Sequence, residues 1–164
     1  MKRLLVLGAA LAVGAAFGGW ALASSLGLFS PPATVVQFGY VKSITPVGKG
    51  YELKLDPAYW LGGLTAQRAA AQVGQSVDND YFIVNADHRL LTYRVSANAT
   101  ATVVTNSSGG VKSTKVPISE LAQIVKGKNP KHRPLLETGS VRTLGYWVKT
   151  SIDTVKSVDQ QYQP

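Results

Sequence analysis

The residues of this chain that can act as acids, bases or nucleophiles are its carboxylates, its hydroxyls and two histidines. The sequence contains no cysteine, which excludes thiolate catalysis, disulfides and cysteine zinc sites. Asp87 and His88 are adjacent, and Asp80 precedes them. An acid beside a histidine suggests an envelope hydrolase that uses Asp80, Asp87 or His88. No nucleophile-elbow motif accompanies them, and a solvated turn before a strand is the simpler interpretation.

Positive charge is densest in the segment 126–133. Its basic side chains are Lys126, Lys128, Lys131, His132 and Arg133. Ammonium and guanidinium groups bind phosphate and the headgroups of anionic lipids. An exposed loop whose cations offset the C-terminal dipole of a preceding helix explains the cluster about equally well. We take these five residues as the candidate binding site.

Oxygen ligands are densest between Asp78 and Asp87. Calcium prefers many oxygen ligands in a flexible loop, but Phe82 occupies the fifth position of an EF-hand loop that starts at Asp78. The acidic and amide side chains are better explained as turn residues on either side of a strand at 81–84. Two histidines in the whole sequence are few for a metal site that is built from histidine ligands. We therefore expect no metal and no other cofactor.

The first 23 residues indicate where the protein works. Lys2 and Arg3 precede an uncharged run, 4–23, that ends in a small-x-small triplet, Ala-Leu-Ala. This arrangement is typical of a signal peptide, although about 20 apolar residues also suffice for a membrane anchor. The alanine and glycine content favours cleavage after Ala23. In both cases the positive-inside rule predicts an extracytoplasmic domain, secreted or tethered to the cytoplasmic membrane. A lipoprotein anchor is excluded because no cysteine is present.

The rest of the chain divides into a spacer and one domain. The segment 24–34 contains Pro31-Pro32 and predicts an extended spacer, and 35–164 predicts a single globular domain. Without Lys2 and Arg3, 15 of the 17 basic residues remain against 9 acidic ones. This surplus favours anionic partners, and nucleic acid is not expected outside the cell. Surface charge for solubility explains the same surplus.

A β-hairpin is the clearest element of the predicted secondary structure. Alternating apolar residues predict strands at 35–45 and 51–55 around a proline- and glycine-containing turn. One face of the first strand is expected to present Val36, Phe38, Tyr40 and Ile44, with Lys42 at the same parity. Directly after the hairpin, Asp56 and Pro57 predict the start of a short helical turn over 58–61.

Strands outnumber helices in the remaining prediction. We expect helices at 64–75 and 118–126, strands at 81–84, 89–96, 100–105, 144–151 and 152–160, and a flexible turn over 106–115. The absence of a repeated strand–helix–strand pattern argues against a parallel α/β sheet. The predicted fold class is α+β, mainly β, with a small antiparallel, partly closed β-barrel or curved sheet of six or seven strands and two short helices.

Three sets of segments resemble a known group of proteins. They are Asp56-Pro57-Ala58-x-Trp60-Leu61 with Thr65-Ala66 and Ala69-Ala70-Ala71, then 79–85, and Tyr146-Trp147-Val148 with Val155 and 159–164. This set is similar to exported actinobacterial proteins of unknown function, which carry a signal peptide or lipoprotein signal before one small β-rich domain. The lipobox cysteine is missing here. The resemblance implies an envelope location, and it implies no activity and no catalytic residues.

Aromatic residues offer one further candidate site. Tyr59, Trp60, Tyr146, Trp147 and Tyr162 can line a ligand groove, although aromatic side chains in such positions more often belong to the core.

We expect a non-enzymatic binding or interaction module of the cell envelope. Its partners would be an anionic lipid, a wall polymer or an envelope protein, contacted through the segment 126–133. A structural accessory subunit of a membrane complex is an alternative, which requires an exposed apolar patch beside the spacer. The hydrolase alternative requires Asp80, Asp87 and His88 to converge in a pocket.

Overall fold

The computed structural model describes residues 34–77, 79–136 and 144–163. These residues belong to one compact unit, which begins at Thr34. The expected signal peptide or anchor at 1–23 and nearly all of the expected spacer lie outside the described residues. Within the described part of the chain, no helix has both the length and the apolar character needed to span a membrane.

Seven strands and two helices are present in the described residues. In chain order they are β1 (Val35–Val47), β2 (Gly50–Gly62), α2 (Gly63–Gln72), β3 (Tyr81–Val84), β4 (Leu91–Ser107), β5 (Gly110–Val116), α3 (Ile118–Val125), β6 (Tyr146–Ser151) and β7 (Thr154–Gln160). The fold is therefore mainly β, and the predicted fold class is confirmed.

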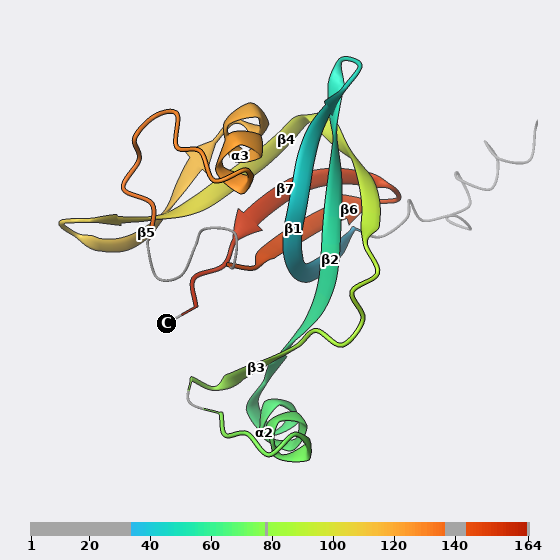
Figure 1. The fold of residues 1–164 in the computed structure, drawn as a ribbon, viewed down its shortest axis with the longest axis vertical. Coiled ribbons are helices and arrows are strands. Elements are labelled where there is room, and N and C mark those ends of the chain that lie inside the picture. The colour runs from blue at the N-terminus through green and yellow to red at the C-terminus, as the bar shows by residue number, and fades with distance from the viewer. Residues whose placement is uncertain (1–33, 78, 137–143, 164) are drawn as a thin grey trace, which may run out of the picture. The chain divides into compact units, whose positions relative to one another are not determined.

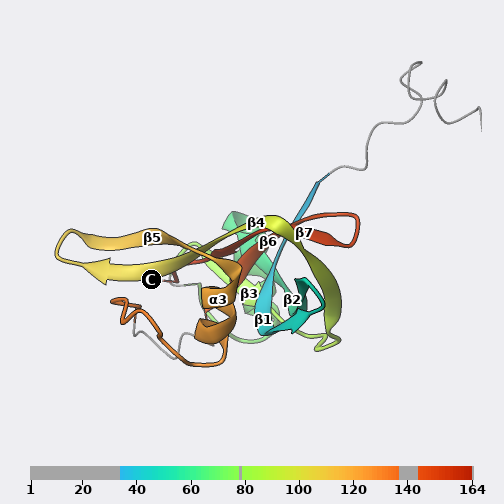
Figure 2. The ribbon, with the colours of Figure 1, turned by 90° about the horizontal axis from the view of Figure 1, so that it is seen from above.

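Five of the strands close into a barrel (Figure 1). Around the barrel the order is β1, β2, β4, β7 and β6, and β6 pairs with β1 to complete the ring. The β4–β7 pairing is parallel, and the other four are antiparallel. Two strands lie outside the ring, since β3 pairs with the end of β2 and β5 pairs with the second half of β4. Figure 2 shows the β4–β5 ribbon projecting from the barrel.

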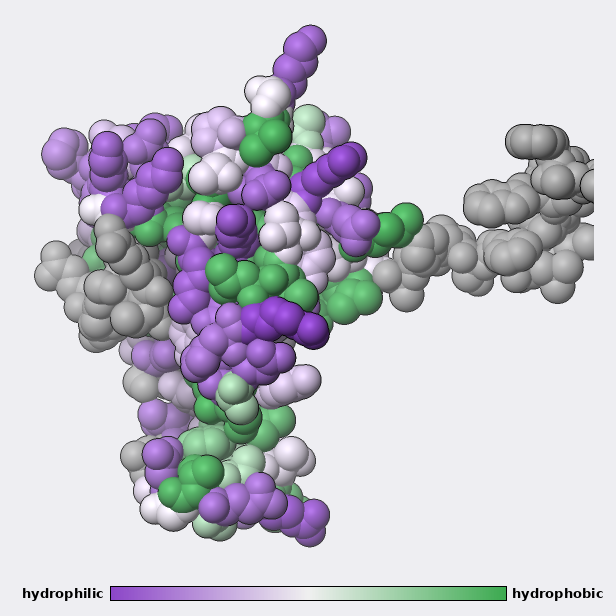
Figure 3. Space-filling model, turned by 45° about the vertical axis from the view of Figure 1, so that its right-hand side comes forward, coloured by the Kyte–Doolittle hydropathy of each residue, from purple (hydrophilic) through white to green (hydrophobic). Residues whose placement is uncertain are grey.

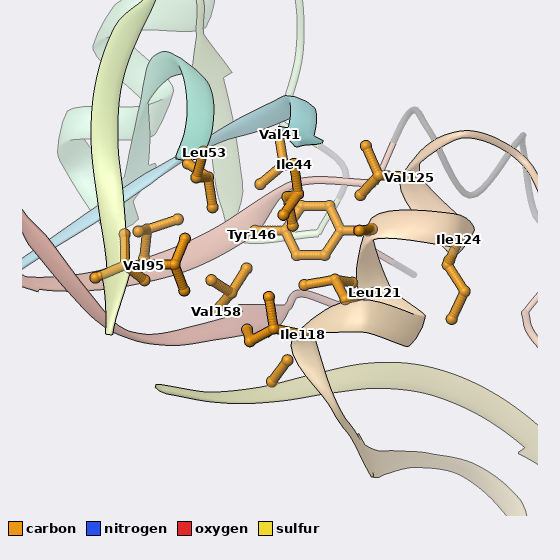
Figure 4. Close-up of a cluster of buried hydrophobic side chains, with 14 of the residues drawn as sticks. Val41, Ile44, Leu53, Val95, Ile118, Leu121, Ile124, Val125, Tyr146 and Val158 are labelled. Carbon is orange, nitrogen blue, oxygen red and sulfur yellow. The ribbon is translucent and has the colours of Figure 1, made fainter. Parts of the chain in front are cut away.

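The barrel interior and one side of α3 form a single apolar core. Apolar residues at 118, 121, 122 and 125 follow the spacing of one helix face, and all four are buried. Leu121 lies beside the ring of Tyr146, and Val41 and Ile44 approach this ring from β1 (Figure 4). The predicted helix at 118–126 is thus confirmed, and its packing fixes the position from which the following loop departs.

The four residues predicted to share one face of the first strand do not all share it. β1 contains a β-bulge at Lys42, because Val41 and Ser43 pair with consecutive residues of β2. The extra residue shifts the alternation, so that Val41 and Ile44 both face the core while positions 36, 38 and 40 lie on the outer side. Lys42 stays on the outer side with them, where it contacts Asp56.

The helical turn expected at 58–61 is also wrong, because β2 continues as a strand through Asp56 and Pro57. On one edge β2 pairs with β1 along this stretch, and Pro57 lies opposite Gly39. On its other edge β2 pairs with β4 as far as Leu55 and with β3 from Tyr59 onwards. Between Leu55 and Tyr59 this edge of β2 has no partner strand among the described residues. Proline is tolerated there because no neighbouring strand requires a hydrogen bond from the N–H that proline lacks.

Two further predictions differ from the structure. The strands expected at 89–96 and 100–105 are parts of one strand, β4, whose pairing with β7 is interrupted between Val95 and Thr100. The segment 106–115 is not a flexible turn throughout, because β5 begins at Gly110 and pairs with β4. Gly110 has a φ of 95°, so a glycine suits the tight turn that makes this pairing possible.

Candidate binding site

The five basic residues predicted as a binding site occupy one loop after α3, which we call the cationic loop (126–133). All of them are exposed except Arg133, which is partly buried. The side chain of Asn129 closes the loop, because its Oδ1 accepts the Arg133 N–H at 2.9 Å and its Nδ2 donates to the Arg133 carbonyl at 2.8 Å. The loop therefore has a defined conformation that its own side chains stabilise.

Glu120 of α3 holds two of these cations. Its side chain is only 3% exposed. Arg133 donates to both carboxylate oxygens, from Nε to Oε1 and from Nη2 to Oε2 at 3.2 Å. Lys131 Nζ lies 3.1 Å from Oε2. The hydrogen bond from Arg133 lowers the pKa of Glu120, burial opposes this shift, and Lys131 adds to it, so the carboxyl is ionised at neutral pH.

Beyond the cationic loop the chain lies against the β4–β5 ribbon. Thr105 of β4 pairs with Leu135 on one edge and with Lys112 of β5 on the other. Lys112 and Lys115 are both exposed. The chain that follows the cationic loop therefore lies along one edge of β4, and β5, which carries these two lysines, lies along the other.

The structure does not bring Asp80, Asp87 and His88 together. Asp80 precedes β3 and the other two follow it, so four strand residues at about 3.3 Å each separate them. Asp87 Oδ1 accepts the backbone N–H of Arg89 at 3.0 Å, as in a turn. His88 Nδ1 lies 3.7 Å from a different carboxylate, Asp56 Oδ2. The convergence that the hydrolase alternative requires is absent from these three side chains.

Asp56 is a site residue that the sequence analysis missed. It is 1% exposed, on β2 in the gap between the β4 and β3 pairings. Lys42 Nζ lies 2.9 Å from Asp56 Oδ2, and Asn85 Nδ2 donates to the same oxygen at 3.4 Å. With His88 these residues form what we call the Asp56 cluster. It attaches the connection between β3 and β4 to the outer side of the barrel.

The contacts of Asp56 keep it charged despite its burial. Burial raises the pKa of Asp56, but hydrogen bonds from Lys42 and Asn85 and the positive charges of Lys42 and His88 outweigh this, so the pKa is lowered. Tyr40, opposite Asp56 in the hairpin, has a raised pKa because of burial and then because of the Asp56 charge. Among the described residues, Asp56 Oδ1 and Asn85 Oδ1 have no hydrogen-bond partner although both are buried.

A pocket of about 530 Å³ lies beside the Asp56 cluster and contains three of the five aromatic residues considered above. Tyr59, Trp60 and Trp147 line it. Tyr146 is instead part of the core, where burial raises its pKa, and Tyr162 is not among the lining residues. Three of these aromatic residues therefore line a pocket, while Tyr146 belongs to the core, as aromatic side chains in such positions more often do.

An exposed apolar surface adjoins this pocket where β1 begins. Val35 is 56% exposed and Val36, which also lines the pocket, is 55% exposed. Figure 3 shows hydrophobic surface at this start of β1. A surface of this kind, directly after residue 34, is what the accessory-subunit alternative requires.

No group of three or more histidine and acidic side chains in the described residues is placed to hold a metal ion. Asp78, the first residue of the calcium-like segment, lies outside the described residues. Comparisons with protein-family models, with curated proteins and with solved structures found no match to this chain.

Proposed function

We propose that this protein is a non-enzymatic binding module of the cell envelope, which contacts phosphate-bearing anionic components through the cationic loop. The observation that carries the proposal is the anchoring of this loop: Glu120 and Asn129 hold it in place while most of its cations stay exposed. A preorganised set of charges binds an anion without the entropic cost of ordering a flexible loop.

The anchoring divides the five basic residues into two roles. Arg133 is 22% exposed and is committed to Glu120, so it acts as a positioning residue. Lys131 is 59% exposed and remains accessible although it contacts the same carboxylate. Lys128 and His132 have no ion-pair partner among the described residues, and both side chains are exposed to solvent. The binding surface is therefore centred on Lys128, Lys131 and His132.

The envelope location is supported by the N-terminal residues. Lys2 and Arg3 followed by the uncharged run 4–23 form the pattern of an export signal. Sequencing the N-terminus of the native protein and fractionating cells into medium, membrane and cytoplasm tests this part. A mature protein that starts at Ser24 in the medium, or an intact chain in the membrane, agrees with the proposal. An intact chain in the cytoplasm contradicts it.

Hydrogen exchange of the cationic loop tests the binding itself. The full chain is placed in nanodiscs of a zwitterionic lipid. An apolar N-terminus associates with any bilayer, so co-sedimentation with vesicles would not report on binding by the cationic loop. Soluble poly(glycerol phosphate) is added in one arm, and phosphatidylglycerol is included in the disc in the other. We expect slower exchange over 126–133 in at least one arm, and the responding arm identifies the phosphate source.

Salt provides the control for this experiment. Exposed charges interact over a Debye length of about 3 Å at 1 M salt against about 8 Å at physiological ionic strength. The slower exchange is therefore expected to disappear at high salt. Unchanged exchange over 126–133 in both arms at low salt contradicts the proposal.

A structural accessory role is the second candidate, and the exposed Val35 and Val36 favour it. In this role the apolar surface at the start of β1 packs against a membrane protein. A photo-crosslinking residue at Val36 in the full chain tests it in cells. Specific cross-linking to one membrane protein, absent from a control with the crosslinker at Val111 of β5, supports this role. Equal labelling from both positions contradicts it.

A further inference from the structure

The pocket beside the Asp56 cluster has the composition of a ligand site separate from the cationic loop. It lies where β2 changes partner from β4 to β3, and β1, β2, β6 and the connection 85–90 contribute its walls. Its volume of about 530 Å³ is within the range of about 300–1,000 Å³ that is usual for small-molecule sites.

The aromatic walls are held in fixed orientations. Trp60 stacks on Tyr81 with ring centroids 4.1 Å apart, and the ring of Phe38 meets Trp60 edge-on at 5.1 Å. Phe38 also meets Trp147 edge-on at 5.2 Å. Trp60 and Trp147 are nevertheless only partly buried. These contacts leave rigid indole surface in the pocket, at little entropic cost to a ligand.

The indole of Trp147 offers carbon surface to a ligand and no free donor. Its Nε1 donates to Gln161 Oε1 at 2.8 Å, so its hydrogen-bonding capacity is already used. Gln37 also lines the pocket, but its side chain alternates with those of Val36 and Phe38 and is directed to the inner side of the barrel. There its Nε2 donates to the Tyr93 hydroxyl at 2.7 Å.

Two exposed charged side chains complete the lining, Asp87 and Arg89. Asp87 provides acceptors and Arg89 provides donors, and their charges cancel. An anionic ligand would be repelled by the carboxylate of Asp87, and a cationic ligand would be repelled by the guanidinium of Arg89. A purely apolar chain would use none of these groups. The lining therefore matches a neutral molecule that has one apolar face and a rim of hydroxyls.

We propose that this pocket binds a neutral saccharide, with the apolar face of a sugar ring on Trp60 and Trp147 and its hydroxyls on Asp87 and Arg89. The Asp56 cluster prepares the site, because Asn85 and His88 attach the connection that carries Asp87 and Arg89 to β2. The proposal is independent of the anionic contacts of the cationic loop.

Tryptophan fluorescence tests the proposal on the full chain. The sequence contains three tryptophans, so a Trp20→Phe background leaves Trp60 and Trp147 as the emitters. The protein is kept in a zwitterionic amine-oxide detergent, since glucoside and maltoside detergents carry sugar headgroups. It is screened on an array of neutral oligosaccharides that includes chitotriose and maltotriose, and each hit is titrated by fluorescence.

We expect a saturable change with at least one neutral oligosaccharide. Asp87→Asn and Arg89→Gln are each expected to weaken that binding at least fivefold, and both positions are exposed, so the fold is retained. Arg68→Gln on α2 repeats the charge change of Arg89→Gln at an exposed position, so it is the matched control for that variant and is expected to leave binding unchanged. The proposal is overturned if no neutral oligosaccharide binds, or if the purely apolar probe decanol changes the emission and no oligosaccharide does. It is also overturned if all three variants bind equally.

Discussion

The guanidinium of Arg133 contacts both carboxylate oxygens of Glu120, although 13 residues separate them in the chain. Glu120 lies on the helix that fills the core, and Arg133 ends the cationic loop. A forked pair of this type fixes both distance and orientation. The loop is therefore attached to a helix that packs in the apolar core, and Arg133 serves as its anchor while the neighbouring cations remain at the surface.

Replacing Glu120 by Gln is expected to lower the free energy of unfolding by about 1.5–3 kcal/mol, the usual contribution of hydrogen bonds to charged groups. The amide keeps the shape of the side chain but loses the charge that Arg133 and Lys131 neutralise. Urea unfolding of the full chain measures the change. Glu52→Gln on β2 is the matched control, expected within about 0.5 kcal/mol of the parent. Equal stability of the two variants contradicts the anchoring role.

The stability of the domain is expected to fall in acid. The pKa values of Asp56 and Glu120 are both lowered in the folded state, so their contribution is complete above the unfolded-state values of about 4. It is lost as the pH falls below 4 and through the lower folded values. Unfolding free energies between pH 7 and pH 2.5 measure this loss. An Asp56→Asn/Glu120→Gln double variant should show a shallower decline, and parallel declines contradict the assignment.

Replacing Asp56 by Asn is expected to loosen the connection 85–90. The variant cannot form the ion pair with Lys42, and we expect a loss of about 1.5–3 kcal/mol in the free energy of unfolding. Amide exchange at 85–90 should accelerate more than exchange in the core strands. Asp80→Asn, an exposed position on the other side of β3, should change neither quantity. Unaltered exchange at 85–90 in the Asp56 variant shows that the cluster does not position this connection.

Replacing Gly39 by Ala is expected to destabilise the hairpin. A methyl group at this position would overlap the backbone carbonyl of Asp56 and touch Pro57 on the neighbouring strand, and backbone atoms cannot easily move away. Overpacking of this kind costs about 1–3 kcal/mol. Gly109→Ala is the control, since a methyl group there meets no atom within 4 Å. Thermal unfolding of the two variants should differ by several degrees, with Gly39→Ala the less stable.

Sequence patterns predicted the elements whose signals are local. The hairpin of β1 and β2, the helix α3 and the strands β6 and β7 follow from alternation, helical spacing and turn residues. The segment at Asp56 and Pro57 did not, because cap and first-turn residues predict a helix there while pairing with β1 imposes a strand. This override depends on a partner that local sequence does not reveal.

The candidate site was predictable only in part for the same reason. A run of cations identified the cationic loop directly. Glu120 and Asp56 gave no comparable signal, because each becomes important through residues that are distant in the chain, Arg133 in one case and Asn85 in the other. The bulge at Lys42 also broke the expected alternation, since it turned Ile44 to the inner side, out of step with Lys42 and Tyr40.

The affinity of the full chain for soluble poly(glycerol phosphate), compared between Lys128→Glu and Lys54→Glu by calorimetry at low salt, tests the proposed function most directly. Both variants change the net charge equally, but Lys54 is an exposed residue of β2 and Lys128 belongs to the cationic loop. At about 1 kcal/mol per lysine near an anionic surface, we expect binding to be weaker by at least about fivefold for Lys128→Glu and to change little for Lys54→Glu. Equal weakening in both variants, or none in either, would contradict it.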